Sequence, residues 1–410
     1  MTNKKKIIND PVHGFITIPS SLIYDIIAHP YFQRLRRIRQ LGLTDMVYPG
    51  ALHTRFHHAL GAMHLMGRAL EILRSKGHFI SSEEQEAAQI AILLHDIGHG
   101  PFSHALESTI LRNVPHEALS RLLMEALNEH FGGGLALAIQ MFSGTYERPF
   151  FHQLISSQLD MDRLDYLQRD CFFTGVLEGT IGAERILKML EIHDNRLVVE
   201  EKGIYSIESF LTARRLMYWQ VYLHKTTISA EKMIIQIIRR ARYVWQQGGE
   251  IFASPSLRVF MEQELHLADF RSQPSYLQAF ANLDDFDLWG AIKIWAAHPD
   301  KILAELCRML LERRLFKIVL SKEPFEQSWV EEKKAALCQE AALQDEDLRY
   351  FLVEGHTENA AYQEQASQIL IKTKQQSILD IAEASDLPNI KALTKIVKKY
   401  YVCWAQHLSL

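Results

Sequence analysis

The chain has 410 residues, of which 48% are hydrophobic and 23% are charged, and its formal net charge is -4 with neutral histidines. This composition excludes a mainly disordered or fibrous protein, and the length predicts two or three packed units. The negative charge provides no global positive field, so nucleic acid is not a favoured partner.

The sequence shows no run of about 18 apolar residues that could span a membrane. Its first residues, MTNKKKIINDPVHGF, lack the apolar segment of a secretory signal. Four cysteines are far apart and form no CxxC pair: Cys171, Cys307, Cys338 and Cys403. We therefore expect reduced cysteines in a cytoplasmic protein that has no membrane contact.

The first predicted element is a short strand in GFITIPS, residues 14–20, where apolar and polar residues alternate. Most later segments have apolar residues three and four positions apart, which predicts a mainly α fold. SSLIYDIIAHPYFQRLRRIRQLG and EEQEAAQIAILLHDIG are examples. The second helix is expected to begin near Ser82 and to end near His95, because glycines and a proline follow it.

RLVVEEKGIYSIES, residues 196–209, predicts a hairpin that turns at 201–203. Further on, DKILAELCRMLLERRLF and KALTKIVKKYYVCWAQHL are amphipathic and predict an α-helical C-terminal region. Glycines, serines and a proline gather in QQGGEIFASPS, which indicates a boundary. We therefore divide the chain into a catalytic core, 1–245, and a C-terminal region, 246–410, that packs on it and offers an oligomer interface.

LLHDIGHGPFSH, residues 93–104, places three histidines and one aspartate in an otherwise apolar stretch. Burying such groups costs free energy unless they are paired, and a metal ion is one suitable partner. Neighbouring residues on a helix diverge by about 100°, so His95 and Asp96 need ligands from other segments to hold one ion. HTRFHHALGAMH and SSQLDMDRLDYLQRD offer them. Imidazole and carboxylate ligands favour Mn, Fe, Zn, Co or Ni over Ca.

Each of these pieces also has a purely structural interpretation. Aspartates spaced along a helix commonly form a solvated face, here with Arg163 and Arg169 interleaved to pair with them. A single histidine is usually structural or exposed, and we interpret four in this way: His53, His57, His64 and His152. Only the combination of segments favours chemistry.

The combined segments resemble the HD phosphohydrolase superfamily, which takes its name from the His-Asp dipeptide. DPVHGFI, FQRLRRIRQLG, PGALHTRFHHALG, LLHDIGHGPFSHALE, DMDRLDYLQRDC and VYLHK follow in the order of the deoxynucleoside triphosphate (dNTP) triphosphohydrolases related to the human SAM- and HD-domain-containing enzyme. The resemblance covers residues 8 to 240 and does not include the SAM domain of the human relative. It implies an HD-domain helical bundle with a small β-hairpin.

By this resemblance four residues are the metal ligands: His58, His95, Asp96 and Asp162. The ion would be a divalent transition metal, Mn, Fe, Zn, Co or Ni, and Mg²⁺ would accompany the substrate phosphates. His104 matches the catalytic histidine, with His116 and Glu107 as its proton-relay partners. The family usually has aspartate where this chain has Glu107. SHALE is expected to open a helix with Ser103 as its N-cap.

The resemblance also implies the substrate contacts. Phosphate binding favours guanidinium forks, and the implied phosphate contacts are Arg55, His99, Arg163, Tyr166 and Arg214. Arg163 stands where the human relative has lysine. The implied sugar contacts are Gln40, Leu41, Asp170 and Tyr222. Tyr222 would pack under the deoxyribose and leave no room for a 2'-hydroxyl. Leu223 stands where the human enzyme has a polar side chain, so base preference is left open.

Regulation is a weaker implication of the resemblance. Gln33 and Arg36 resemble two contacts of a guanine-sensing site, but Ala28 stands where that site needs a carboxylate. Activation by GTP in the human manner is therefore not expected, and a charged helix face is an equal interpretation. Relatives assemble as dimers or tetramers, so we expect a homo-oligomer.

The leading hypothesis is a metal-dependent hydrolase that cleaves a dNTP to deoxynucleoside and inorganic triphosphate, by attack of metal-activated water on the α-phosphate. The first alternative is an HD-type phosphodiesterase or nuclease that acts on another nucleotide or on DNA ends. The second is a non-catalytic nucleotide sensor. The sugar contacts favour the leading hypothesis over the first alternative, and the retained catalytic residues argue against the second.

Overall fold

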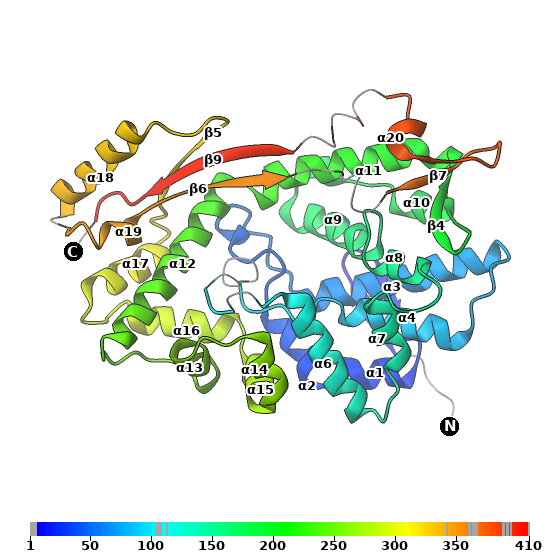
Figure 1. Cartoon of the computed structure of the whole chain (residues 1–410), viewed down its shortest axis with the longest axis horizontal. Helices are drawn as coiled ribbons and strands as arrows, with labels where there is room; N and C mark the ends of the chain where they lie inside the picture. Colours follow the sequence, from blue (N-terminus) through cyan, green and yellow to red (C-terminus); the bar gives the residue numbers. More distant parts are fainter. Residues whose placement is uncertain are drawn as a thin grey trace.

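The computed structural model describes residues 6–102, 109–111, 114–341, 343–359, 362, 368–387, 390, 393 and 396–408. It is mainly α-helical, as predicted, and carries three small sheets (Figure 1). Among the described residues, no helix is both long and apolar enough to cross a membrane.

The N-terminal part of the chain is a β-hairpin followed by helices. Its strand β2 confirms the strand predicted at 14–20. The elements are β1 (Ile7–Asp10), β2 (Gly14–Thr17), α1 (Ser21–Ala28), α2 (Pro30–Gln33), α3 (Arg55–Ser75), α4 (Ser82–Leu94), α6 (His116–His130), α7 (Ala136–Phe142), α8 (Phe150–Ile155) and α9 (Met161–Thr174), with 3₁₀ turns at Arg34–Arg37 and Thr44–Met46.

Helix α3 packs against both α4 and α9, and this three-helix contact positions the site. The start of α4 is fixed by a capping box, in which Ser81 accepts the N–H of Glu84 and the Glu84 carboxylate accepts the N–H of Ser81. The helix ends at Leu94, as the glycine-rich stretch after it predicted. Helix α9 begins at the N-cap Asp160 and ends at Gly175, whose φ of 75° suits glycine.

The hairpin predicted at 196–209 is wrong in its position along the chain. Strands β3 (Leu190–His193) and β4 (Arg196–Glu200) pair instead, and the turn between them is Asp194 and Asn195. Both turn residues have positive φ, which Asp and Asn tolerate better than most side chains. Residues 201–203, the predicted turn, form a 3₁₀ turn that leads into a helix.

The second half of the chain begins with helices, and its C-terminal region, 246–410, is not all helical as predicted, because it also contains strands. The helix predicted in DKILAELCRMLLERRLF is confirmed as α17. The helices are α10 (Ala183–Met189), α11 (Ile204–Met217), a π-helical turn (Tyr218–Tyr222), α12 (Lys225–Gln246), α13 (Pro255–Glu262), α14 (Leu267–Ser272), α15 (Pro274–Asn282), α16 (Asp285–Trp295), α17 (Lys301–Leu311), α18 (Gln327–Ala341), α19 (Leu348–Phe351) and α20 (Ile381–Ala384), with a 3₁₀ turn at Leu177–Gly179.

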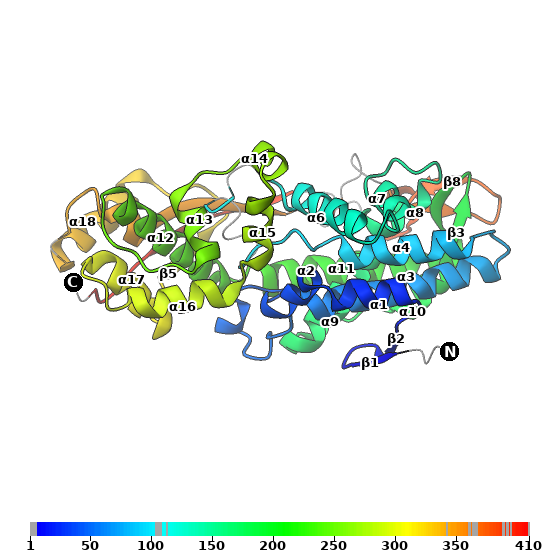
Figure 2. The ribbon, with the colours of Figure 1, turned by 90° about the horizontal axis from the view of Figure 1, so that it is seen from below.

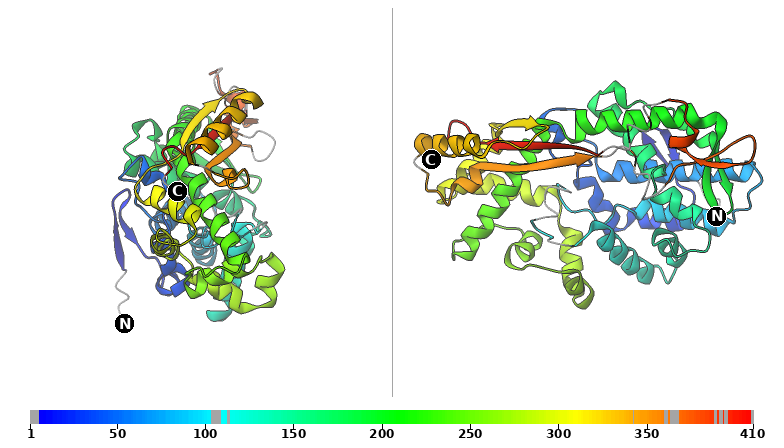
Figure 3. Two further views of the ribbon diagram at one scale, coloured as in Figure 1. Left: turned by 90° about the vertical axis from the view of Figure 1, so that its left-hand side faces the viewer. Right: turned by 45° about the horizontal axis from the view of Figure 1, so that its top comes forward.

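The helix predicted in KALTKIVKKYYVCWAQHL is wrong, because VKKYYVCW forms the central strand of a sheet. Strand β9 (Val397–Trp404) lies between β5 (Lys317–Ser321) and β6 (Leu352–Asn359), antiparallel to both. Figures 1 and 3 show β6 and β9 running side by side from the α18 end of the molecule toward α11. A valine- and tyrosine-rich segment favours this central position once partner strands lie on both sides.

Two further strands return to the other end of the molecule. Strand β7 (Leu370–Lys372) pairs in parallel with β4, and β8 (Ile378–Asp380) pairs with β7, which gives the order β3-β4-β7-β8. The C-terminal part also contacts the N-terminal helices directly, since the Arg34 guanidinium donates to the carbonyl of Phe280 in α15 and lies over its ring. The boundary at 245/246 stays a prediction; α12 ends at Gln246 and α13 begins at Pro255.

Candidate metal centre and substrate site

The His-Asp dipeptide lies in a tight turn that α6 holds in place. Ser120 of α6 accepts the backbone N–H of Gly98 at 2.9 Å and donates to the carbonyl of His95 at 2.7 Å. A Cβ at Gly98 would lie 2.2 Å from the carbonyl oxygen of His116, so only glycine allows this close packing. The turn thus aims His95 at α3 and α9.

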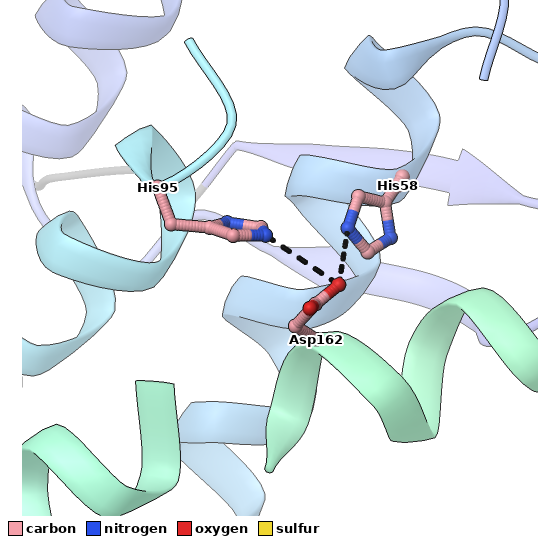
Figure 4. A group of neighbouring side chains, drawn as sticks. All are labelled: His58, His95 and Asp162. Carbon is pink, nitrogen blue, oxygen red and sulfur yellow. Dashed lines mark ion pairs between the residues drawn. The ribbon is translucent and has the colours of Figure 1, made fainter. Parts of the chain in front are cut away.

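Three side chains from three helical segments meet at one point (Figure 4). Oδ1 of Asp162, on α9, lies 3.2 Å from Nε2 of His58, on α3, and 3.5 Å from Nε2 of His95. Asp96 lies beside this group, with one carboxylate oxygen 3.9 Å from Nε2 of His58 and the other 3.4 Å from Nε2 of His95. The structure therefore brings three of the predicted metal ligands into one group and places the fourth, Asp96, beside it.

The other ring nitrogen of each histidine has a partner that fixes the ring. Nδ1–H of His58 donates to Oδ2 of Asp165 at 2.8 Å, and Nδ1–H of His95 donates to the carbonyl of Ile92 at 2.6 Å. Both Nε2 atoms are buried, and within the described residues neither makes a hydrogen bond of acceptable geometry. Buried polar atoms of this kind usually have a partner. Their donor types and orientation fit a divalent metal ion held with two carboxylates.

The charges in this group depend strongly on one another. Burial lowers the pKa of His58, but the nearby carboxylates of Asp162 and Asp165 outweigh burial and raise it to about 10. Burial raises the pKa of Asp162, but His58 and His95 hold it well below its usual range. Burial likewise raises the pKa of Asp165, but its neighbours, chiefly Arg169, hold this pKa well below its usual range. Carboxylates that stay ionised beside histidines form a site where a cation would replace protons.

Asp96 belongs to a second group of potential ligands. Its Oδ1 lies 3.3 Å from Nε2 of His99, whose ring stacks on His116 at a centroid distance of 3.8 Å. One ligand atom from each of these three residues lies within 4.8 Å of the others. The buried Arg55 forms an ion pair with the same carboxylate. His104, Glu107 and the predicted N-cap Ser103 lie outside the described residues.

One of the arginines among the predicted phosphate contacts, Arg163, lies beside Asp162. Arg163 pairs with Asp160 and lies 3.9 Å from Oδ2 of Asp162, and its buried Nε finds no hydrogen-bond acceptor among the described residues. Nη1 of Arg214, on α11, donates to Gln158 at 3.1 Å, and its Nε likewise lacks an acceptor within the described part of the chain. Two guanidinium N–H groups are thus available to an anionic ligand.

The predicted sugar contacts form a connected group. The Tyr222 hydroxyl donates to Oδ2 of Asp170 at 2.7 Å, and Oδ1 of Asp170 accepts Nε2–H of His53 at 2.7 Å. The backbone N–H of Gln40 donates to the carbonyl of His53 at 3.0 Å, and the buried amide oxygen of Gln40 has no donor among the described residues. Leu41 is partly buried against the core nearby in sequence. The ring of Tyr166 lies 6.0 Å from that of Tyr222.

Sequence reasoning did not identify several residues that support this group. His53, interpreted as structural or exposed, is buried and contacts Asp170. Asp165 was only one of several spaced aspartates, yet it holds His58. The Tyr218 ring lies 5.2 Å from that of Tyr222. The position of Asp165 one helical turn before Arg169 was the available signal, but spacing alone does not distinguish a solvated face from a buried one.

Models of known protein families match two parts of the chain. The HD domain matches residues 55–170, and the HD associated region matches residues 181–250. The first match includes all four predicted metal ligands. A crystal structure described as a phosphohydrolase from Bacteroides thetaiotaomicron is 52% identical, has a TM-score of 0.95 and is covered completely, over 98% of this chain.

Curated relatives extend the likeness. An uncharacterized protein of Bacillus subtilis, YwfO, is 33% identical over 88% of this chain and 81% of its own length. The protein named deoxynucleoside triphosphate triphosphohydrolase SAMHD1 homolog, from Dictyostelium discoideum, is 32% identical over 58% of this chain and 49% of its own length. The SAMHD1 protein of Danio rerio is 29% identical over 65% and 50%. The chain thus spans about half the length of these two relatives.

Proposed function

We propose that this protein cleaves dNTPs to deoxynucleoside and inorganic triphosphate. The chain belongs to the HD phosphohydrolase family, which is the premise of this proposal. The family relationship fixes the class of chemistry better than the substrate. The substrate therefore has to be argued from the side chains around the site, and from relatives that carry the name of this activity.

The observation that supports the proposal is the convergence of a metal-ligand group, a phosphate-binding group and a sugar-binding group around α9. Asp162, Arg163 and Asp170 all come from this one helix, and the three belong to the three different groups. A nucleoside triphosphate carries the matching parts in this order: phosphates near the metal and the arginines, and the sugar about two helical turns away.

His58, His95, Asp96 and Asp162 would hold a divalent transition metal ion. Such an ion supplies a Lewis acid and lowers the pKa of water. The guanidinium groups of Arg163 and Arg214 bind the phosphate oxygens and offset the negative charge that develops on them. Water attacks the α-phosphorus and the bond to the 5'-oxygen breaks. His104 is the proposed donor of a proton to that oxygen, with His116 and Glu107 as its relay.

The sugar group supplies the preference for deoxynucleotides. Asp170 holds the Tyr222 hydroxyl, so the ring has a fixed position against which the sugar would pack. A ring held in this way excludes a 2'-hydroxyl by contact, whereas the carboxylate of Asp170 and the amide of Gln40 are suited to bind the 3'-hydroxyl.

The test is a product assay on metal-loaded protein. The metal content is measured by inductively coupled plasma mass spectrometry, and each dNTP is incubated with wild type and Asp162→Ala before the products are separated by ion-exchange chromatography. Inorganic triphosphate with deoxynucleoside, formed by wild type alone, supports the proposal. Pyrophosphate, or mononucleotides released from DNA, would support a phosphodiesterase or nuclease, and nucleotide binding without any product would support a sensor.

The expected homo-oligomer is also a proposal. Light scattering coupled to size-exclusion chromatography distinguishes a monomer of 47.3 kDa from a dimer or tetramer. The measurement is made with and without dNTP, because a substrate that binds one assembly better shifts the equilibrium toward it.

A further inference from the structure

The turn of the N-terminal hairpin reaches from the surface to the residue that supports His58. His13, between β1 and β2, donates its Nε2–H to Oδ1 of Asp165 at 2.6 Å, and Oδ2 of Asp165 accepts Nδ1–H of His58 at 2.8 Å. The hairpin itself projects from the helical body near the N-terminus (Figure 2). A surface element thus lies two hydrogen bonds from a predicted metal ligand.

An arginine and a second aspartate hold the hairpin turn against α9. Nε and Nη2 of Arg169 both donate to Asp165 at 2.9 Å, and Nη1 donates to Asp10 at 2.8 Å. Oδ1 of Asp10 accepts the backbone N–H groups of Val12 at 3.0 Å and His13 at 2.9 Å, which shapes the turn. The side chains of Asp165 and Arg169 are fully buried, and that of His13 is 8% exposed.

The carboxylate of Asp165 is completely occupied. It accepts two N–H groups from Arg169, one from His13 and one from His58, and an ionised carboxylate offers about four such positions. Each donor therefore restricts rotation of the carboxylate. The orientation of the carboxylate in turn decides which nitrogen of His58 carries a proton and where Nε2 points.

We propose that His13 is a positioning residue of the metal centre, which holds the Asp165 carboxylate so that Nε2 of His58 faces Asp162. This inference rests on the proposed metal site. A purely structural role of His13, as an anchor of the hairpin, predicts a different result: removal of the side chain would lower the unfolding temperature but would leave the affinity for metal unchanged.

The test compares metal affinity in the full chain. Dissociation constants for Co²⁺ are measured by competition with a chromogenic chelator for wild type, His13→Ala, His13→Gln and His64→Ala. The control His64 packs beside His13, with ring centroids 5.5 Å apart, and makes no hydrogen bond to Asp165 within the described part of the chain. We expect His13→Ala to weaken Co²⁺ binding about tenfold, as loss of an outer-shell partner does elsewhere. His13→Gln, which keeps a donor, should restore most of the affinity.

Unchanged Co²⁺ affinity in His13→Ala overturns the inference, and so does an equal loss in His64→Ala, which would indicate local packing. If circular dichroism shows that His13→Ala does not fold, Asp10→Asn replaces it. This substitution weakens the hydrogen bonds that shape the same turn and keeps the His13 side chain. Wild-type protein that binds no Co²⁺ overturns both the inference and the metal-dependent function. Wild-type protein that binds Co²⁺ but releases no triphosphate contradicts only the proposed substrate, and the His13 comparison still decides the inference.

Discussion

The hydroxyl of Tyr222 donates a hydrogen bond to Oδ2 of Asp170 at 2.7 Å, and this contact joins the π-helical turn after α11 to α9. Burial raises the pKa of Tyr222 well above its usual range, and the neighbouring Asp170 raises it further, so the phenol remains a donor. π-Helical turns are often found at functional sites. Here the turn carries Tyr222, whose ring is held by the backbone of the turn at one end and by Asp170 at its hydroxyl.

Replacement of Tyr222 is expected to reduce discrimination between dNTPs and ribonucleotides. Tyr222→Ala removes the ring, so we expect the ratio of kcat/KM for dNTP over rNTP to fall by roughly 10- to 100-fold, or ~1–3 kcal/mol. Tyr222→Phe keeps the ring and loses only the bond to Asp170, so it should retain most of the discrimination. Equal ratios in wild type and Tyr222→Ala would contradict the proposed packing under the sugar.

Removal of the metal or of a ligand is expected to abolish hydrolysis. A metal Lewis acid contributes several kcal/mol to the transition state, so His95→Ala should lower kcat/KM by at least about 100-fold and should reduce the bound metal. His152→Ala is the control, since His152 contacts the carbonyl of Met141 in α7. Metal content and initial rates are measured on the same preparations. A His95→Ala variant with full metal content and full rate would refute the ligand assignment.

Arg214 is expected to contribute to phosphate binding through its Nε–H, which has no acceptor among the residues that the structure describes. Loss of a hydrogen bond to a charged group costs about 1.5–3 kcal/mol, so Arg214→Ala should lower kcat/KM by about 10- to 100-fold. Arg214→Lys keeps the charge but not the fork and should recover only part of the loss. Arg215→Ala, on the neighbouring and more exposed residue of α11, is the control. A similar loss in both alanine variants would indicate a general effect of charge.

Stability is expected to depend on the protonation of Asp285. Burial raises the pKa of Asp285 to about 6, although the backbone N–H groups of Arg39 and Phe102 donate to its carboxylate and act in the opposite direction. A folded-state pKa above the unfolded value favours folding of the protonated form. The protonated carboxyl therefore adds about 3 kcal/mol to the free energy of unfolding below about pH 4. This contribution is lost as the pH rises to about 6.

Urea unfolding of wild type and Asp285→Asn between pH 4 and pH 7 measures this effect. Asparagine does not titrate, so the free energy of unfolding of wild type minus that of the variant should decrease from pH 4 to pH 6 and then remain constant. A difference that increases with pH in this window would show that the two N–H donors outweigh burial.

We expect that only glycine fits at position 61, beside Asp165 and Arg169, which hold His58 in place. A Cβ at this position of α3 would lie 1.9 Å from Oδ1 of Asp165 and 2.3 Å from Nη2 of Arg169. Overpacking of this kind typically costs about 1–3 kcal/mol, so Gly61→Ala should lower the free energy of unfolding despite the higher helix propensity of alanine. Gly290→Ala is the matched control on α16, where a Cβ meets nothing within 4 Å, and it should stabilise by about 0.5–1 kcal/mol. Thermal unfolding compares the two.

Local sequence patterns predicted the helices better than they predicted the strands. The end of α4 beside His95 followed from glycines that oppose a helix, because that signal lies within a few residues. The segment KKYYVCW was misassigned, because its partners β5 and β6 lie far away in sequence and a short apolar run fits a helix or a strand equally well. For the same reason the β3–β4 turn was predicted at the wrong residues, although Asp194 and Asn195 provided a usable local signal.

By itself, the sequence determined the residue types of the site and the helices that carry them. The resemblance to the HD phosphohydrolases named His58, His95, Asp96 and Asp162 as metal ligands, since each lies in a segment that matches the family. Only the tertiary structure decided which aspartate of α9 supports a histidine and which residue of the hairpin reaches it. Asp162 and Asp165 are one helical turn apart and chemically identical, so packing of α3 and the hairpin against α9 alone distinguishes their environments.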